Sequence, residues 1–369
     1  MMINMDTKKR LVNLDLLKVV SMVMIVCLHY LGKGGVLDKA TVNDSNYYVA
    51  WLFEILSVVG VNCFILCTGY LMKDNRFRLS KIIYLWLQIF AVNAVCMIIS
   101  FALGMQKMSA MGVIKCFFPI TSNAYWYMSA YFIFYLFSPL LIAVANSLTV
   151  ERLKMTVILL VLIFALVPWQ WTKIDYGSHV VWFVVLFFVA TYIRRADLFK
   201  RRVRSYAGYY LLLSAVMLVI TLIVATAGKK FALSEYIDVR GFNFILTLIS
   251  SVMLFAAFKN LKIKKARAAG YITFLSSLTL GVYLIHFNRY IADWFWAKAI
   301  APLNYFDKPY FVFHMIACVL AVFFVCAFLE YFRQLLFKLF NVPSLCEKLG
   351  NKIQSIFNKF CNSKFIEKM

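Results

Sequence analysis

Charged residues are scarce in this chain, and no polar stretch is long enough to form a separate soluble domain. Only 15% of its 369 residues are charged and 63% are hydrophobic, and apolar runs of 18 or more residues recur from end to end. This composition excludes an ordinary soluble enzyme. It predicts an all-α fold, a polytopic transmembrane helical bundle, in which function resides within or between the helices.

The sequence also lacks a metal-type cysteine cluster and a cleavable leader. Its nine cysteines are scattered, and Cys63 and Cys67, one helical turn apart, have no His or carboxylate in that turn. Packing roles are therefore favoured over metal ligation, and we expect no metal site. The apolar stretch at the N-terminus carries Asp15 and Lys18 and has no small-residue cleavage site. We interpret it as a retained first helix.

We predict about ten membrane spans, each near the ~20 residues that a bilayer requires. They are 11–31, 48–72, 82–104, 125–145, 155–171, 179–193, 206–227, 241–258, 271–292 and 310–332. The fifth and sixth are short, which leaves the count open by one or two. Residues 333–369 carry apolar side chains at helical spacing among lysines, which predicts a basic amphipathic tail on the inner leaflet. The chain thus divides into a transmembrane domain, 1–332, and this tail.

The formal charge of +23 follows membrane topology. With the N-terminus inside, the cytoplasmic segments hold 27 of the 39 Lys and Arg residues, and the outer loops hold ten. This positive-inside pattern predicts that both termini are cytoplasmic. We expect a multi-pass protein of the cell inner (plasma) membrane, with the lipid bilayer and not nucleic acid as its partner.

Two ionisable residues, Lys18 and His29, lie within the first span. Such groups are costly in lipid and mark functional sites by default. Eleven residues at ~100° each make about 1100°, so both side chains project from one helix face, about 16–17 Å apart. This stripe predicts a track for a long ligand with an anionic end. Two structural alternatives stay open: Lys18 pairs with Asp15 and snorkels inward, and His29 is a hydrogen-bonded packing residue.

Further titratable groups are predicted at the depth of His29, in the outer half of the membrane. Glu54 enters from outside on the second span, and His286 lies in the outer half of the ninth. Arg289 and Tyr283, each three residues from His286, share its helix face. We therefore predict that His29, Glu54, His286 and Arg289 converge.

Four segments, in order along the chain, carry a family pattern. The first is Asp15, Leu17, Lys18 and His29, and the others are ILCTGYLMKDNRFRLSK (65–81), WYMSAYFIFYLFSP (126–139) and TLGVYLIHFN (279–288). Together they resemble the acyltransferase-3 family of integral membrane acyltransferases. The chain departs from that pattern with Lys18 for the commoner Arg, Thr68 for Ser, and Arg76-Phe-Arg78 for Arg-x-x-Arg. We expect a stand-alone membrane module without a fused extracytoplasmic domain.

The resemblance implies transfer of an acyl group, usually acetyl, from cytoplasmic acyl-CoA to a hydroxyl of a cell-envelope glycan or lipid-linked sugar. Acetyl-CoA would be a cosubstrate, and no cofactor would be permanently bound. His29 would take the hydroxyl proton, Glu54 would orient its ring, and His286 or Arg289 would stabilise the oxyanion or hold the acceptor. The expected residues are catalytic His29, Glu54 and His286; donor-binding Lys18, Asp15, Arg76 and Arg78; and acceptor-binding Arg289, Tyr283 and Trp126.

Other functions stay open. A non-enzymatic exporter or flippase for polysaccharide or lipid-linked sugar would also need polar groups in its spans, but it would not need coenzyme A. A sensor or scaffold would leave the outer titratable cluster unexplained. The sequence does not decide the acceptor sugar, acetyl against succinyl, an acyl-His intermediate against direct transfer, or whether the protein forms a homodimer.

Overall fold

The computed structural model describes residues 10–73, 77–107, 109–166, 178–231 and 240–361, and these residues contain helices and no strand. The α-helices are α1 (Val12–Leu31), α2 (Val36–Lys39), α3 (Tyr47–Val58), α4 (Gly60–Leu71), α5 (Leu79–Ala102), α6 (Ala110–Phe117), α7 (Trp126–Ser147), α8 (Val150–Val161), α10 (Ser178–Arg195), α11 (Val203–Phe231), α12 (Ile245–Lys259), α13 (Ala266–His286), α14 (Ala292–Trp294), α15 (Phe311–Leu339) and α16 (Val342–Cys361). Two π-helices, Leu162–Leu166 and Phe295–Ile300, and a 3₁₀-helix, Pro302–Asn304, complete them. The prediction of an all-helical fold is confirmed for this part of the chain.

Seven helical segments within the described ranges are long and apolar enough to cross a membrane. They are Val12–Leu31, Tyr47–Leu71 (α3 and α4 together), Leu79–Ala102, Trp126–Ser147, Val203–Thr226, Ala266–His286 and Phe311–Leu339. Seven of the ten predicted spans coincide with them.

The other three predicted spans are shorter or interrupted. Span 241–258 contains the 15-residue helix α12, and span 179–193 lies within α10. Span 155–171 begins in α8, continues as the π-helix to Leu166, and then passes outside the described residues. The count of ten is therefore not confirmed.

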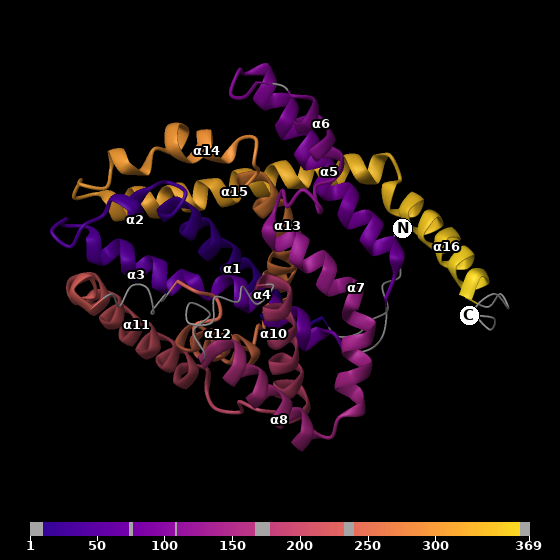
Figure 1. Cartoon of the computed structure of the whole chain (residues 1–369), viewed down its shortest axis with the longest axis horizontal. Coiled ribbons are helices and arrows are strands. Elements are labelled where there is room, and N and C mark those ends of the chain that lie inside the picture. The colour runs from indigo at the N-terminus through magenta and orange to yellow at the C-terminus, as the bar shows by residue number, and fades with distance from the viewer. Residues whose placement is uncertain (1–9, 74–76, 108, 167–177, 232–239, 362–369) are drawn as a thin grey trace.

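Helix α1 lies at the centre of the bundle, against α3, α4, α12, α13 and α15 (Figure 1). Its contact with α4 is close because Gly60 has no side chain. A Cβ at Gly60 would lie 2.9 Å from the carbonyl oxygen of Ser21. Because α1 is central, the polar side chains on it face other helices and not lipid.

The Gly-Tyr pair at the end of α4 joins this helix to α10. A Cβ at Gly69 would lie 3.0 Å from the Cα of Phe187, so the two backbones approach closely. Arg194, at the end of α10, donates to the carbonyls of Gly69, Tyr70 and Met72 over 3.2, 2.7 and 3.1 Å. The guanidinium thus satisfies carbonyls that the end of α4 leaves without helical partners.

A buried ion pair within α15 also accepts a hydrogen bond from α5. Glu330 is fully buried, and Arg333 one turn later donates to both of its oxygens over 2.7 Å. Gln88 of α5 and Gln334 also donate to Glu330, over 3.3 and 2.9 Å. Gly281 of α13 leaves the space for this carboxylate, because a Cβ there would lie 2.3 Å from it.

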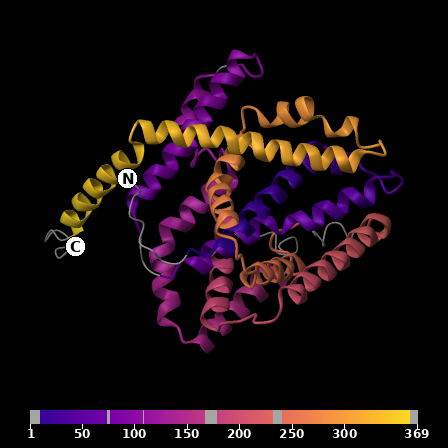
Figure 2. The same ribbon diagram turned by 180° about the vertical axis from the view of Figure 1, so that it is seen from behind.

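The chain turns sharply between α15 and α16. Helix α15 continues through the predicted boundary at 332 to Leu339, and Asn341 then adopts a left-handed conformation with φ of 55°. Asn is one of the few residue types that tolerate this conformation at a helix end. The tail helix α16 then packs along α5 at one edge of the molecule (Figures 1 and 2).

Candidate active site

A cavity of about 810 Å³ lies beside α1, between α3, α4, α5, α7, α13 and the segment that precedes α12. Its polar and aromatic lining residues are Lys18, His29, Glu54, Phe64, Thr68, Lys81, Tyr84, Gln88, Trp126, Tyr127, Tyr131, Tyr135, Arg240, Phe242, Ser276, Thr279 and Tyr283. This volume lies within the range of small-molecule sites. The eleven-residue spacing in α1 correctly places Lys18 and His29 in one wall, because both line this cavity.

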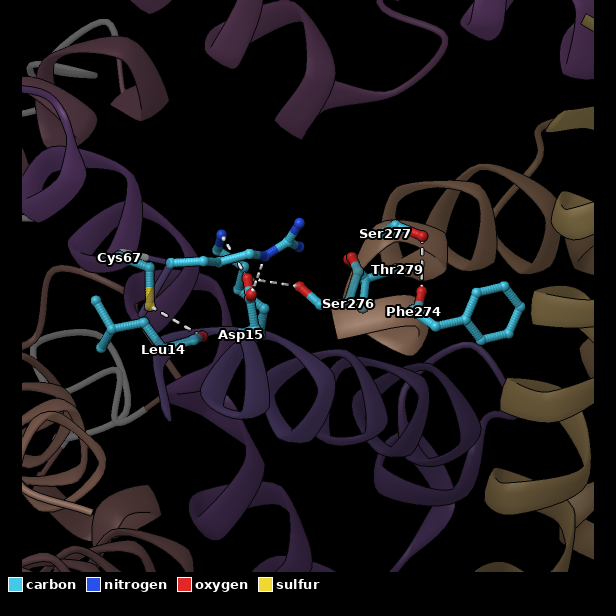
Figure 3. Close-up of polar contacts among 9 residues, drawn as sticks. Leu14, Asp15, Cys67, Phe274, Ser276, Ser277 and Thr279 are labelled. Atoms are coloured by element: carbon cyan, nitrogen blue, oxygen red, sulfur yellow. Dashed lines mark hydrogen bonds and ion pairs between the residues drawn. The ribbon is translucent and has the colours of Figure 1, made fainter. Parts of the chain in front are cut away.

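At the Lys18 end of the cavity, one carboxylate contacts two cations. Asp15 accepts from Arg10 Nε over 2.5 Å and from Lys18 Nζ over 3.5 Å. Ser276 Oγ of α13 donates to the same carboxylate over 3.1 Å, and Asp15 and Ser276 point toward each other in Figure 3. The predicted pair of Asp15 and Lys18 is present, and Arg10 gives the cluster an excess of positive charge.

At the His29 end of the cavity, two imidazole rings and a carbonyl form a hydrogen-bonded chain. Nδ1 of His29 lies 2.8 Å from Nε2 of His286, and Nδ1 of His286 lies 2.5 Å from the carbonyl oxygen of Val282. A carbonyl oxygen only accepts, so Nδ1 of His286 carries a proton. When both rings are neutral, Nε2 of His286 accepts, Nδ1 of His29 donates, and Nε2 of His29 keeps its lone pair. His29 lines the cavity whereas His286 does not, so the nitrogen that keeps its lone pair belongs to the ring that lines the cavity.

The orientation of His29 is fixed on a second side by stacking. The ring of Phe287 lies parallel to it, with centroids 4.2 Å apart and planes 11° apart. Phe287 follows the last residue of α13, where the indole of Trp296 donates to the carbonyl of His286 over 3.1 Å. The end of α13 therefore positions the imidazole of His29 by two contacts: His286 hydrogen-bonds to it and Phe287 stacks on its face.

Tyrosines from α7 form an aromatic wall in the cavity. Tyr127, Tyr131 and Tyr135 follow one another at four-residue spacing, with centroids 6.1 and 6.4 Å apart and near-parallel planes. Tyr283 of α13 continues the wall from Tyr127, at 5.8 Å, to Phe287, at 5.7 Å. An extended ligand between Lys18 and His29 would thus lie along aromatic faces.

The wall of the cavity formed by Trp126 and Phe242 is stabilised by aromatic stacking and by buried hydrogen bonds. Trp126 stacks on Phe242 with centroids 5.4 Å apart. The buried amide of Asn62 donates to the carbonyl of Phe242 over 2.8 Å and accepts from the indole of Trp182 over 2.9 Å. Arg240, which lies between the predicted spans 206–227 and 241–258, also lines the cavity.

Several predicted site residues lie elsewhere than expected. Glu54 lines the cavity, and the position behind the His29 ring that we predicted for it is held by His286. Arg289 does not converge with the imidazoles, because α13 ends at His286 and the guanidinium donates to the carbonyl of Ser122 over 2.9 Å. Arg78 lines a separate groove, and Arg76 lies outside the described residues.

The end of α13 explains the error over Arg289. Asn288 Oδ1 accepts from the backbone N–H of Tyr290 over 2.9 Å, which closes a local turn in place of a further helical turn. A helix continued to residue 292 would have kept Arg289 on the face of His286. Among the described residues, no group of three or more His, Cys, Asp and Glu side chains is arranged to hold a metal ion.

The fold and site define a helical protein with apolar helices long enough to cross a membrane, in which an imidazole, His29, and a cation, Lys18, line one cavity. The acyltransferase-domain family Acyl_transf_3 matches residues 11–330, nearly the whole chain, which therefore belongs to the acyltransferase-3 family and is a multi-pass membrane acyltransferase. No curated protein and no solved structure matched the chain.

Proposed function

We propose that this protein transfers an acetyl group from cytoplasmic acetyl-CoA to a hydroxyl of a cell-envelope glycan or lipid-linked sugar. The observation that carries the proposal is the hydrogen-bonded chain from Val282 through His286 to His29, which leaves Nε2 of His29 as a base in the cavity. The 810 Å³ of the cavity also include Lys18, on the same face of α1.

In the proposed reaction, the acceptor hydroxyl oxygen attacks the thioester carbonyl carbon while Nε2 of His29 takes the hydroxyl proton. The tetrahedral intermediate then collapses, the C–S bond breaks, and the imidazolium returns the proton to the leaving thiolate sulfur. The products are an ester on the acceptor and free coenzyme A. Both nitrogens of His286 are engaged with His29 and Val282, so we assign it to positioning His29 and not to oxyanion stabilisation.

The donor would enter from the end of the cavity at which Lys18 and Lys81 lie. Arg10 and Lys18 share one carboxylate, so the cluster retains a positive charge toward an anionic ligand. The pyrophosphate of coenzyme A would lie near these cations, and its pantetheine arm would extend along the tyrosines of α7 toward His29. The distance of about 16–17 Å between Lys18 and His29 along the helix suits an extended arm.

The acceptor would bind at the outer wall. Trp126 and Tyr283 offer aromatic faces, on which the C–H faces of a sugar ring pack, and Glu54 offers carboxylate oxygens for sugar hydroxyls. Arg289 is not part of the proposed acceptor site, because its guanidinium donates to the carbonyl of Ser122.

We further propose that both termini are cytoplasmic, that ten segments cross the membrane, and that the membrane is the inner (plasma) membrane. The support is the concentration of Lys and Arg in the inner segments. This orientation puts Lys18 on the side where acetyl-CoA is made and His29 on the side where envelope glycans are.

Replacing His286 with alanine is expected to lower kcat about 10- to 10³-fold, because His29 loses the acceptor that fixes its tautomer. The KM for the donor should change little, since His286 does not line the cavity. Steady-state kinetics of the purified variant in detergent measure both constants. An unchanged kcat would show that His286 does not position the base.

Replacing Lys18 with methionine is expected to weaken acetyl-CoA binding about 10-fold, because a charge-assisted contact to phosphate is lost while the side-chain length is kept. Isothermal titration of the purified protein measures the affinity. Lys18→Arg is the control: it keeps the charge and should bind at least as tightly as the native protein. Equal affinity of the Lys18→Met variant and the native protein would refute the donor track.

The function itself is tested by mass spectrometry of envelope glycans from a strain that lacks the gene. Loss of a +42 mass difference would support acetyl transfer, and loss of +100 would indicate succinyl. Unmodified glycan that accumulates inside the cell, with purified protein that transfers no acyl group, would favour the exporter instead.

A further inference from the structure

A second groove, of about 450 Å³, lies between the tail helix α16 and the start of α5. Its lining residues are Phe77, Arg78, Leu79, Ser80, Pro139, Glu347, Gly350, Asn351 and Gln354. The last four belong to α16, beyond the residues 11–330 that match the family. One wall of this groove is therefore made by a part of the chain that the family match does not cover.

The groove continues the inner end of the large cavity along two helices. On α5, Ser80 lines the groove and the next residue, Lys81, lines the cavity. On α7, Pro139 lines the groove and Tyr135, one turn earlier, lines the cavity. Phe77 stacks on Tyr135 with centroids 5.8 Å apart and planes 28° apart, so the aromatic wall of the cavity also reaches the groove.

Helix α16 is seated against α5 by a glycine. A Cβ at Gly350 would lie 2.6 Å from the backbone nitrogen of Ser80, so any side chain there would push α16 away. Leu345, Leu349 and Ile353 form an exposed apolar stripe on α16. At ~100° per residue, this stripe lies about 60–140° around the helix from Gly350. Such a stripe suits the lipid interface, which leaves the polar side chains of α16 on the aqueous side.

The side chains around the groove suit a nucleoside phosphate. Phe77 offers a ring on which a base stacks, and Arg78 offers a guanidinium for phosphate oxygens. Asn351 and Gln354 offer amides for a base edge, and Glu347 accepts from ribose hydroxyls or an exocyclic amine. All three are on the exposed side of α16, where a ligand from the cytoplasm would meet them.

We propose that this groove binds the phosphoadenosine end of the coenzyme A donor, with α16 as the wall that contacts the base and ribose. The proposal rests on the proposed function, since it assumes an acyl-CoA donor. It adds a site for the nucleotide, separate from the cluster of Lys18, Arg10 and Asp15 that would hold the pyrophosphate.

The test compares two donors, acetyl-CoA and S-acetyl-phosphopantetheine, which lacks the adenosine. Asn351→Ala is expected to raise the KM for acetyl-CoA about 3- to 10-fold and to leave the KM for the short donor unchanged. Ser355→Ala, an exposed polar residue of α16 that does not line the groove, is the matched control and should change neither KM. Equal effects of Asn351→Ala on both donors, or no effect on either, would overturn the proposal.

Binding of adenosine 3′,5′-bisphosphate by titration calorimetry tests the groove without any transfer. The native protein should bind it, and Gly350→Leu, which displaces α16, should bind it at least 10-fold more weakly. A native protein that transfers acetyl groups but does not bind this nucleotide would refute the groove and leave the proposed function intact. Binding without transfer from any acyl-CoA would support the groove and refute the proposed function.

Discussion

Replacing His29 with alanine is expected to reduce acyl transfer about 10²- to 10⁴-fold, the usual contribution of a positioned general base. The reason is that, when both rings are neutral, the chain through His286 leaves the lone pair of His29 on Nε2, and His29 lines the cavity. Glycan acetylation, compared at equal membrane abundance of the native and variant proteins, is the measurement. Because the variant keeps the cavity and the cations, binding of acetyl-CoA should persist while transfer is lost.

His314→Ala is the matched control for this prediction. His314 also contacts α1, with Nδ1 hydrogen-bonded to the hydroxyl of Tyr30 over 2.8 Å, but it does not line the cavity. Loss of a histidine there should leave transfer nearly unchanged. If His29→Ala acetylates glycan as well as His314→Ala does, His29 is not the base.

Replacing Glu330 with alanine is expected to lower the free energy of unfolding by about 3–5 kcal/mol, because it leaves the charge of Arg333 without its carboxylate. Glu330 is fully buried and the side chain of Arg333 is 11% exposed. Gln88 and Gln334 would lose an acceptor in the same change. Unfolding of the purified protein in mixed micelles, followed by circular dichroism, measures the loss.

The exposed ion pair of Lys33 and Asp293 provides the comparison. Its nitrogen and oxygen are 3.2 Å apart, but the side chains are 44% and 82% exposed. Asp293→Ala should therefore change the free energy of unfolding by only about 0–1 kcal/mol. Equal stability of the two variants would mean that the Glu330 network does not hold α15 to its neighbours.

Helical periodicity within one span was the part of the site that sequence could predict. Lys18 and His29 share a face because eleven residues make nearly three full turns, and this depends only on regular helix geometry. Likewise Asp15 and Lys18 meet because they are three residues apart on one helix. Both relations are local to one helix. Lys18 and His29 line the same cavity, and Lys18 pairs with Asp15.

Contacts between helices could not be predicted in the same way. Depth along the spans grouped Glu54, His286 and Arg289 with His29, but depth does not determine the direction in which a side chain points. His286 faces His29 because α13 packs on α1. Arg289 turns away because Asn288 ends the helix, which apolarity alone does not predict. Arg10 and Arg240 fall outside the predicted spans, and a count of positive charges does not separate a cation that lines a cavity or pairs with a buried carboxylate from one in a loop.

The central position of α1 also sets when the site can exist during synthesis. His29 is synthesised 257 residues before its partner His286, and Asp15 is synthesised 261 residues before its partner Ser276. At ~5–20 residues per second, these partners leave the ribosome roughly 13–52 s after the first helix. Until then, the ionisable groups of α1 are in a nascent membrane protein without the helix that completes their hydrogen bonds. A truncated chain that ends before α13 would keep the contacts of Asp15 with Arg10 and Lys18 but would leave His29 without His286 and Asp15 without Ser276.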